Sequence, residues 1–339
     1  MNDQIKIGLI GGSGLGAAMT QQTQDGRRHE LQTPFGSPSD AIVETSWHGL
    51  PVLFLNRHGP GHLLNPTQVP YRANIFALKQ LGVTHILASG AVGSLREEYK
   101  PRHLVIPDQI IDKTHKRPST FYENAAVHVE FAEPFDPVLR RILVEAGSGS
   151  LVPGSGEKTG ESAASSSADP GVTVHDGGCY VAMEGPAFST RAESLMHRLW
   201  GGDLIGMTAM PEAKLAREAE IAYALVALVT DFDCWRQPPA AAVQTQGQSS
   251  NPPARPVEVD PFLLLKEIIA NLNAATENAI ALLRRSVELM AAPQRREELL
   301  NSPARKALQL GIWSDKAQIS PEEVRRLAPL WLKYFEEKT

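Results

Sequence analysis

The stretch from Asp203 to Trp235 restricts the fold more than any other part of the sequence. It contains two apolar runs typical of strands, Leu204–Met207 and Tyr223–Val229, and a helix-like run from Glu212 to Glu220 between them. This order predicts a strand–helix–strand crossover whose loops gather at one edge of a sheet. The second run is almost entirely apolar, which is typical of a strand covered on both faces. We therefore expect an α/β fold.

The second apolar run ends abruptly in an acidic segment, Thr230-Asp231-Phe232-Asp233. Polar groups at the carboxyl end of a buried strand are where open α/β sheets form binding sites. A single Asp at such a position is more often a solvated strand end or a helix N-cap. Two Asp residues around an aromatic residue, after so apolar a strand, favour a site.

Size, charge and cysteine content exclude several classes of protein. The 339 residues are enough for one large α/β domain or two ordinary ones. Lys and Arg number 33 against 38 Asp and Glu, a formal net charge of -5, and no basic block occurs, so we expect no binding to nucleic acid or to an anionic membrane. Cys179 and Cys234, the two cysteines, are too few for a disulfide framework or a Cys-rich metal site.

The amino-terminal segment MNDQIKIGLIGG predicts a strand that runs into a loop and not a signal peptide. No apolar run is long enough to span a bilayer, so we expect a soluble cytoplasmic protein. No His, Asp or Glu cluster has ligand spacing, and we expect no metal site.

A glycine-rich loop, GGSGLG (residues 11–16), follows the first predicted strand at once. Glycines allow backbone N–H groups to approach an anion closely, and Ser13 adds a hydroxyl donor. The loop also fits a dinucleotide fingerprint loosely, but the residues after it are polar and show no clear apolar helix face. We favour phosphate or a sulfate-like anion over NAD.

A predicted hairpin, Ala41–Trp47 with Val52–Asn56, leads into a second polar loop. Its second strand ends at Arg57 and His58, and His62 follows after a short Gly/Pro segment. Arg presents a planar fork suited to an oxyanion, and His58 is a further candidate donor. One His alone is usually a hydrogen-bonded structural residue, whereas three such groups after a strand indicate an anion or sugar site.

Two more loops follow predicted strands. The strand His85–Ser89 ends in small residues that begin with Gly90 and Ala91, and the strand Tyr180–Met183 leads to a loop that carries Phe188. An aromatic residue at the tip of such a loop is either part of the core or a platform for a flat ligand.

We expect further helices to start at Asn65-Pro66, within Pro134-Phe135-Asp136-Pro137, near Thr190 and at Asp260-Pro261. A last helix, opened by the capping-box pattern after Ser320, carries an apolar stripe that packs on the body or on another subunit. Two low-complexity stretches, 147–169 and 236–256, predict mobile insertions. We therefore divide the chain into a domain over 1–290 and a C-terminal helical extension over 291–339.

Taken together, these loops resemble the trimeric purine nucleoside phosphorylases, and most closely their 5′-methylthioadenosine phosphorylase branch. The resemblance runs from about Lys6 to about Leu289 without the two low-complexity stretches, and as a set its blocks are highly specific. The blocks are GLIGGSGL, TPFGSPSDA, NRHGPGH, VPYRANIFALK, GSLREE, RPSTFY, EGPAFSTRAES, GMTAMPEAKLAREA and TDFDCW.

The resemblance implies a single α/β domain with a central mixed sheet flanked by helices, phosphorylase/hydrolase-like, assembled as a homotrimer. It implies a pentosyltransferase of purine and methionine salvage that needs no cofactor and uses inorganic phosphate as co-substrate. Asp231 is implied as the catalytic acid at N7 of the base. The implied phosphate-binding residues are Ser13, Arg57, His58, Gly90, Ala91 and Thr208. The implied nucleoside-binding residues are Met207, Phe188, Ser189, Asp231, Phe232, Asp233, His62, Val259 and, from a neighbouring subunit, His128.

Base choice depends on a few positions. Asp231 and Asp233 are able to accept hydrogen bonds from the N6 amino group of adenine. Ser189 occupies the position at which the resemblance implies a Glu in the 6-oxopurine branch. Gly206 is more similar to the 6-oxopurine branch, and Ser89 and Gly90 replace two Thr residues. The resemblance therefore implies 5′-methylthioadenosine as substrate, with a 6-oxopurine nucleoside phosphorylase for inosine, guanosine or methylthioinosine as the alternative.

Two alternatives from other classes remain. An NAD-binding oxidoreductase would need an acidic residue at the end of its second strand, where this chain has Asn56, Arg57 and His58. A catalytically idle nucleoside-binding module would use the C-terminal helix to bind a partner. The presence of Arg57, His58, Thr208 and Asp231 argues against it.

Overall fold

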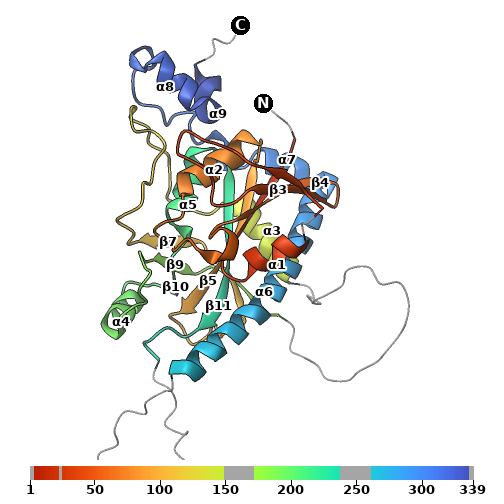
Figure 1. Ribbon diagram of the computed structural model, residues 1–339, viewed down its shortest axis with the longest axis vertical. Coiled ribbons are helices and arrows are strands. Elements are labelled where there is room, and N and C mark those ends of the chain that lie inside the picture. The colour runs from red at the N-terminus through yellow and green to blue at the C-terminus, as the bar shows by residue number, and fades with distance from the viewer. Residues whose placement is uncertain (1–3, 23–24, 149–171, 237–260, 336–339) are drawn as a thin grey trace, which may run out of the picture.

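The computed structural model describes residues 4–22, 25–148, 172–236 and 261–335 (Figure 1). The strands are β1 (Ile7–Gly11), β2 (Arg27–His29), β3 (Ile42–Trp47), β4 (Leu50–Asn56), β5 (His85–Ser94), β6 (Leu104–Ile106), β7 (Gln109–Asp112), β8 (Val174–Asp176), β9 (Cys179–Ala182), β10 (Leu204–Gly206) and β11 (Ala222–Asp231). The helices are α1 (Leu15–Gln22), α2 (Tyr71–Gln80), α3 (Pro137–Gly147), α4 (Arg191–Leu199), α5 (Ala209–Glu218), α6 (Pro261–Ala291), α7 (Arg296–Leu300), α8 (Pro321–Arg326) and α9 (Ala328–Trp331).

One mixed sheet joins these strands. Its main path runs β2-β3-β4-β1-β5-β10-β9-β7, while β11 pairs with β5 and β6, and β6 pairs with β8. β1 is parallel to β4 and β5, and β3 is antiparallel to β2 and β4. The expected α/β fold with a central mixed sheet is confirmed.

Both faces of the sheet are covered by helices, as Figure 1 shows. Odd-numbered residues of β11 from Tyr223 to Val229 belong to a core cluster shared with α2 and α5. Even-numbered residues from Ala222 to Leu228 belong to a second cluster shared with α3 and α6. Successive side chains of a strand point to opposite faces, so the nearly unbroken apolar run of β11 follows from its position between two helical layers.

The predicted strand–helix–strand unit is present, but the sequence did not indicate how its two strands are placed in the sheet. β10 is antiparallel to β5 and β11 is parallel to it, so the two strands meet through β5 and not side by side. Ile205 and Asp231 are both registered with Gly93 of β5. β10 and the end of β11 therefore flank the same residue of β5, one on each side.

Two helix predictions need correction. The helix expected at Asn65 starts instead at Tyr71, because the Asn65 side chain accepts the N–H groups of Thr67 and Gln68 in a turn, and Pro70 disfavours helical geometry in the residue before it. The last predicted helix is divided at Leu327 into α8 and α9.

The C-terminal extension packs on the body. The side chains of Leu327, Leu330 and Trp331 are buried in the cluster that contains α2, and the Trp331 ring lies 4.9 Å from that of Tyr122. In Figure 1, α9 lies beside α2 and α8 lies beyond α9. The predicted mobile stretches fall almost wholly on 149–171 and 237–260, outside the described residues. None of the helices in the described ranges is long and apolar enough to cross a membrane.

Candidate active site

Three strand-end loops come together around β5. A Cβ atom on Gly90 would lie 3.2 Å from Oγ1 of Thr208, and one on Gly93 would lie 3.1 Å from a carboxylate oxygen of Asp231. A Cβ atom on Gly12 would lie 2.7 Å from a terminal nitrogen of Arg57. The structure therefore brings together Gly90, Thr208 and Asp231 along β5, with the glycine-rich loop and Arg57 next to them.

Arg57 is fully buried beneath the glycine-rich loop. Its guanidinium donates two hydrogen bonds of 2.8 Å to the carboxylate of Glu212 and one of 2.7 Å to the carbonyl of Ser89. Tyr223 donates a further hydrogen bond of 2.8 Å to Glu212. Although burial opposes charge, Glu212 holds the pKa of Arg57 above its usual value. Three of the five guanidinium N–H groups are thus occupied by protein acceptors, and the positive charge is balanced within the protein.

His58 is a neutral imidazole here. Burial, with the nearby charge of Arg57, lowers the pKa of His58 to about 4. Its Nδ1 lies 2.8 Å from the carbonyl of Leu64, which only accepts, so Nδ1 carries the proton and Nε2 is an acceptor. The ring stacks on His62 at 4.2 Å. Nε2 of His58 is therefore not a hydrogen-bond donor in this geometry, and the expected contact of His58 with phosphate stays a prediction.

Asp231 and Asp233 form a pair of partly buried carboxyl groups. Asp231 accepts hydrogen bonds of 2.7 Å from the hydroxyl of Thr230 and from the backbone N–H of Asp233. Asp233 accepts one of 2.5 Å from Ser194 of α4. Burial raises the pKa of Asp231, and so does the charge of Asp233. Burial also raises the pKa of Asp233. A carboxyl group with a raised pKa is suited to carry a proton to a leaving group.

The loop after β9 approaches the same carboxyl groups. The carbonyl of Ser189 accepts from the Cys234 thiol at 3.3 Å, which ties this loop to the end of β11. Phe188 is 84% exposed, so its stacking on a sugar or base stays a prediction. Phe232 lies under the guanidinium of Arg236, 3.9 Å from the ring centre.

Gly206 has a structural reason for its identity. A Cβ atom there would lie 2.1 Å from the hydroxyl oxygen of Tyr180, which is fully buried. The same hydroxyl accepts the backbone N–H of Thr208 at 3.2 Å. Gly206 therefore makes room for the tyrosine that fixes Thr208, and its presence does not indicate a preference for 6-oxopurines.

A buried arginine that the sequence did not single out organises the loops on one side of the site. Arg117 donates hydrogen bonds to the carbonyls of Met207 (2.5 Å) and Met210 (2.7 Å) and to the carboxylate of Glu184 (3.0 Å). Glu184 lies two residues after the end of β9, and a position just after a strand is also what indicated the other candidate residues. Met207 is thus held by its backbone.

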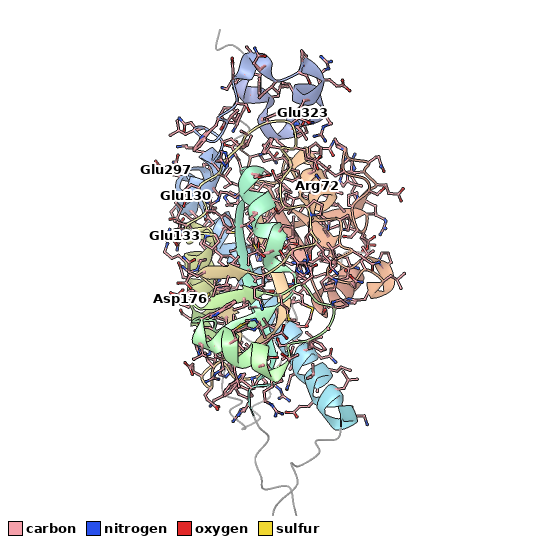
Figure 2. The ribbon with its side chains drawn as sticks, turned by 90° about the vertical axis from the view of Figure 1, so that its left-hand side faces the viewer. Arg72, Glu130, Glu133, Asp176, Glu297 and Glu323 are labelled. Carbon is pink, nitrogen blue, oxygen red and sulfur yellow. The ribbon has the colours of Figure 1, made fainter. Side chains whose placement is uncertain are left out.

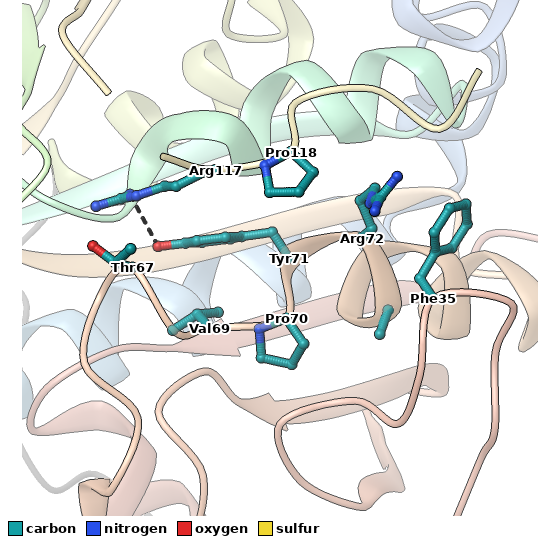
Figure 3. A pocket seen from close by; sticks show the side chains of 9 residues that line it. Phe35, Thr67, Val69, Pro70, Tyr71, Arg72, Arg117 and Pro118 are labelled. Atoms are coloured by element: carbon teal, nitrogen blue, oxygen red, sulfur yellow. Dashed lines mark hydrogen bonds between the residues drawn. The ribbon is translucent and has the colours of Figure 1, made fainter. Parts of the chain in front are cut away.

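Figure 3 shows a cavity of about 140 Å³ beside this arginine, in which the hydroxyl of Tyr71 accepts a hydrogen bond of 3.2 Å from Arg117. Its lining comes from the 67–73 and 117–118 segments and Phe35. None of the residues assigned to phosphate or nucleoside lines it, so this cavity adjoins the candidate site and is not part of it.

His128 lies apart from the strand-end group. Its ring is 4.5 Å from that of Trp313, and its backbone N–H donates to Gly311 of the C-terminal extension. The same segment is held by Arg217 of α5, which binds the carboxylate of Glu130 and the carbonyl of Glu133. Figure 2 labels both glutamates on one flank of the molecule. Val259 lies outside the described residues.

Among the residues that the structure describes, no three His, Cys, Asp or Glu side chains are grouped to hold a metal ion.

Comparison with known proteins identifies the family. Residues 6–288 match the model of the phosphorylase superfamily. S-methyl-5′-thioadenosine phosphorylase of Gloeobacter violaceus is 42% identical over 98% of this chain and 96% of its own length. That of Thermosynechococcus vestitus is 51% identical over 68% of this chain and 73% of its own.

Solved structures agree. A methylthioadenosine phosphorylase from an antarctic soil metagenomic library is 42% identical and aligns with a TM-score of 0.77, covering 97% of this chain and 99% of its own. Methylthioadenosine phosphorylase from Schistosoma mansoni in complex with adenine is 33% identical with a TM-score of 0.72, over 91% and 99%. The chain belongs to the phosphorylase superfamily and, within it, to the S-methyl-5′-thioadenosine phosphorylase family.

Proposed function

We propose that this protein cleaves the N-glycosidic bond of 5′-methylthioadenosine with inorganic phosphate, giving adenine and 5-methylthioribose 1-phosphate. The observation that carries the proposal is the arrangement along β5: Gly90 lies against Thr208, and Gly93 lies against Asp231. Three residues of strand span about 10 Å. That spacing leaves room for a phosphate and a ribose between the anion donors and the carboxyl pair.

In the proposed reaction, a phosphate oxygen attacks C1′ of the ribose while the bond from C1′ to N9 breaks. The electron pair of that bond passes to the purine, which takes a proton at N7. Asp231, with its raised pKa, supplies this proton and recovers one from the monoprotonated phosphate. Backbone N–H groups of the glycine-rich loop and of Ala91, the hydroxyls of Ser13 and Thr208, and the remaining N–H groups of Arg57 bind the phosphate.

Adenine is favoured over 6-oxopurines by two features. Asp231 and Asp233 offer acceptors to an N6 amino group, whereas a 6-oxopurine would set its O6 against these oxygens. The adenine complex of the Schistosoma relative supports the same base. The one residue that pointed to 6-oxopurines, Gly206, is accounted for by Tyr180.

The proposal has three further parts, which concern assembly, location and cofactors. We infer a homotrimer in which His128 reaches the 5′ end of a neighbour's nucleoside, with His62, Met207, Phe188 and Val259 around the sugar and its 5′ group. We infer a cytoplasmic location from the composition. No cofactor besides the co-substrate phosphate is required by the reaction.

Purified protein incubated with 5′-methylthioadenosine tests the proposal. Free adenine should accumulate only when phosphate is present, together with an equal amount of 5-methylthioribose 1-phosphate. Adenine released equally well without phosphate would indicate a hydrolase. No adenine under either condition, from protein shown to be folded, would favour a binding module or an oxidoreductase.

A further inference from the structure

The end of β11 leaves the regular ladder with β5 at Thr230. Val229 is registered with Val92 of β5. Asp231 is registered with Gly93, the next residue of β5, so Thr230 is an extra residue on β11. A β-bulge of this kind re-aims the side chains next to it. Neighbouring side chains of a regular strand point to opposite faces, whereas here the side chains of Thr230 and Asp231 meet at 2.7 Å.

The bulge is held in place from α6. Nδ2 of Asn271 donates a hydrogen bond of 3.0 Å to the carbonyl of Thr230, and Oδ1 of Asn271 accepts one of 2.9 Å from Nε of Arg102. A guanidinium only donates, so the contact with Arg102 determines which end of the amide faces Thr230. Asn271 and Thr230 are both buried. The backbone of Thr230 is therefore fixed, whereas its hydroxyl proton is able to rotate.

The hydroxyl of Thr230 lies between two oxygen atoms. Its Oγ1 is 2.7 Å from Oδ2 of Asp231 and 3.2 Å from the carbonyl oxygen of Val92. A hydroxyl carries one proton and two lone pairs, so it donates to one of these atoms at a time. With Asp231 ionised, one of the two contacts lacks a proton. With a proton on Oδ2, both contacts are hydrogen bonds, because Asp231 donates to Thr230 and Thr230 donates to Val92.

The other oxygen of Asp231 has a different partner. Oδ1 accepts the backbone N–H of Asp233 at 2.7 Å, and a backbone N–H only donates. The surroundings therefore favour a proton on Oδ2 and not on Oδ1. Burial raises the pKa of Asp231, and the hydrogen bond from Thr230 lowers it. The hydroxyl thus opposes part of the effect of burial by stabilising the ionised carboxylate.

We propose that Thr230 is a positioning residue for the proton of Asp231. Before the reaction, its hydroxyl accepts from the protonated carboxyl group and donates to Val92. As the proton passes from Oδ2 to N7 of the base, the O–H of Thr230 turns from the carbonyl of Val92 to the carboxylate just formed. Thr230 exchanges no proton in this step, since its own proton only changes acceptor.

The turn of this hydroxyl favours the proton transfer. A hydrogen bond to a carboxylate is stronger than one to a neutral oxygen, so Asp231 gains a better donor at the moment at which it becomes charged. This role rests on the proposed function, in which Asp231 is the acid.

Thr230→Val tests the role, because it removes the hydroxyl and keeps the shape of the side chain. The kcat for 5′-methylthioadenosine at saturating phosphate should fall roughly tenfold, since one charge-assisted hydrogen bond is lost as Asp231 ionises. The KM should change less than about twofold, because the hydroxyl acts through Asp231 and not on the bound nucleoside. Thr230→Ser should restore kcat. Thr230→Ala takes the place of Thr230→Val if the latter does not fold.

The pH profile separates this role from a merely structural one. Without its donor the pKa of Asp231 rises further, so the decline of kcat at high pH, where Asp231 loses its proton, should move to higher pH in Thr230→Val. Thr84→Val is the matched control. It removes another buried hydroxyl, next to the opposite end of β5, and should keep the wild-type profile.

A second measurement needs no turnover. In protein labelled with carbon-13 at the side-chain carboxyl of aspartate, NMR follows the titration of Asp231, whose signal is the one missing from Asp231→Asn. The midpoint should be higher in Thr230→Val than in wild type, and close to wild type in Thr230→Ser. If wild type releases no adenine from 5′-methylthioadenosine, the proposed function fails, and the titration still decides whether Thr230 governs this proton.

Three results would overturn the proposal. One is an unchanged high-pH decline of kcat in Thr230→Val, and another is an equal titration midpoint of Asp231 in wild type and Thr230→Val. The third is a Thr230→Ser protein as slow as Thr230→Val, because the methyl group and not the hydroxyl would then be responsible.

Discussion

The guanidinium of Arg57 and the carboxylate of Glu212 face each other through two hydrogen bonds of 2.8 Å, and neither side chain is exposed to solvent. The arginine expected to attract phosphate is therefore already neutralised by a carboxylate of the same chain. In the proposed reaction, neutral donors therefore supply much of the phosphate binding, namely the backbone N–H groups and hydroxyls around Gly90 and Thr208. Arg57 is proposed to contribute its remaining N–H groups and a fixed geometry.

This pairing changes what an Arg57 variant measures. Arg57→Met should lower the free energy of unfolding by about 3–5 kcal/mol, because it leaves the buried carboxylate of Glu212 without its partner. The double variant Arg57→Met/Glu212→Leu should recover much of that loss, since it removes both charges. Urea unfolding of the three proteins is the measurement. A single variant as stable as wild type would show that the pair does not hold the site together.

Gly206 should be intolerant of any side chain for steric reasons. Gly206→Ala places a Cβ atom 2.1 Å from the Tyr180 hydroxyl, so we expect a loss of about 1–3 kcal/mol in the free energy of unfolding. The preference for adenine over hypoxanthine nucleosides should not change, because the clash is with Tyr180 and not with the base. A reversed base preference in a folded Gly206→Ala protein would contradict this explanation.

Glu218 should make the free energy of unfolding depend on pH. Burial raises the pKa of Glu218 from 4.5 to about 7, so the folded state binds the proton more tightly than the unfolded chain. The stabilisation is fully present below pH 4.5 and is lost as the pH rises to about 7, a change of roughly 3 kcal/mol. Glu218→Gln should remove this decline. Urea unfolding at several pH values compares the two slopes, and equal slopes would refute the assignment.

The C-terminal extension should be essential for stability. Trp331 is fully buried in the cluster around α2, so Trp331→Ala should cost about 3–5 kcal/mol. Trp313 belongs to the same extension but is 70% exposed, and Trp313→Ala should cost less than about 1 kcal/mol. Thermal or urea unfolding distinguishes them. Similar losses for both variants would mean that the extension is not docked as described.

Sequence reasoning predicts those features of the fold that depend on the pattern of neighbouring residues. The apolar run of β11 predicted a strand covered on both faces, and the structure places that strand between two helical layers. The capping box at the start of α4, formed by Thr190 and Glu193, follows from the same local reasoning. These features are decided within a few residues, so periodicity and capping rules find them.

Contacts between distant segments lie beyond such reasoning. Glu212 lies 155 positions from Arg57, and nothing in the local sequence of either residue indicates the other. Gly206 suggested a base preference until the hydroxyl of Tyr180 was found against it. The tautomer of His58 depends on the carbonyl of Leu64, which no motif specifies. Partners of this kind are set by tertiary packing.

The most direct test of the proposed function is the kcat/KM of the protein for 5′-methylthioadenosine against inosine and guanosine, with phosphate at saturation. We predict that 5′-methylthioadenosine is preferred by about 10⁴, because a site built to accept hydrogen bonds from an amino group strongly rejects its oxo analogue. Asp231→Asn should narrow this ratio, since its amide is able to donate to O6. A kcat/KM for inosine equal to or above that for 5′-methylthioadenosine would contradict the account and assign the protein to 6-oxopurine nucleosides.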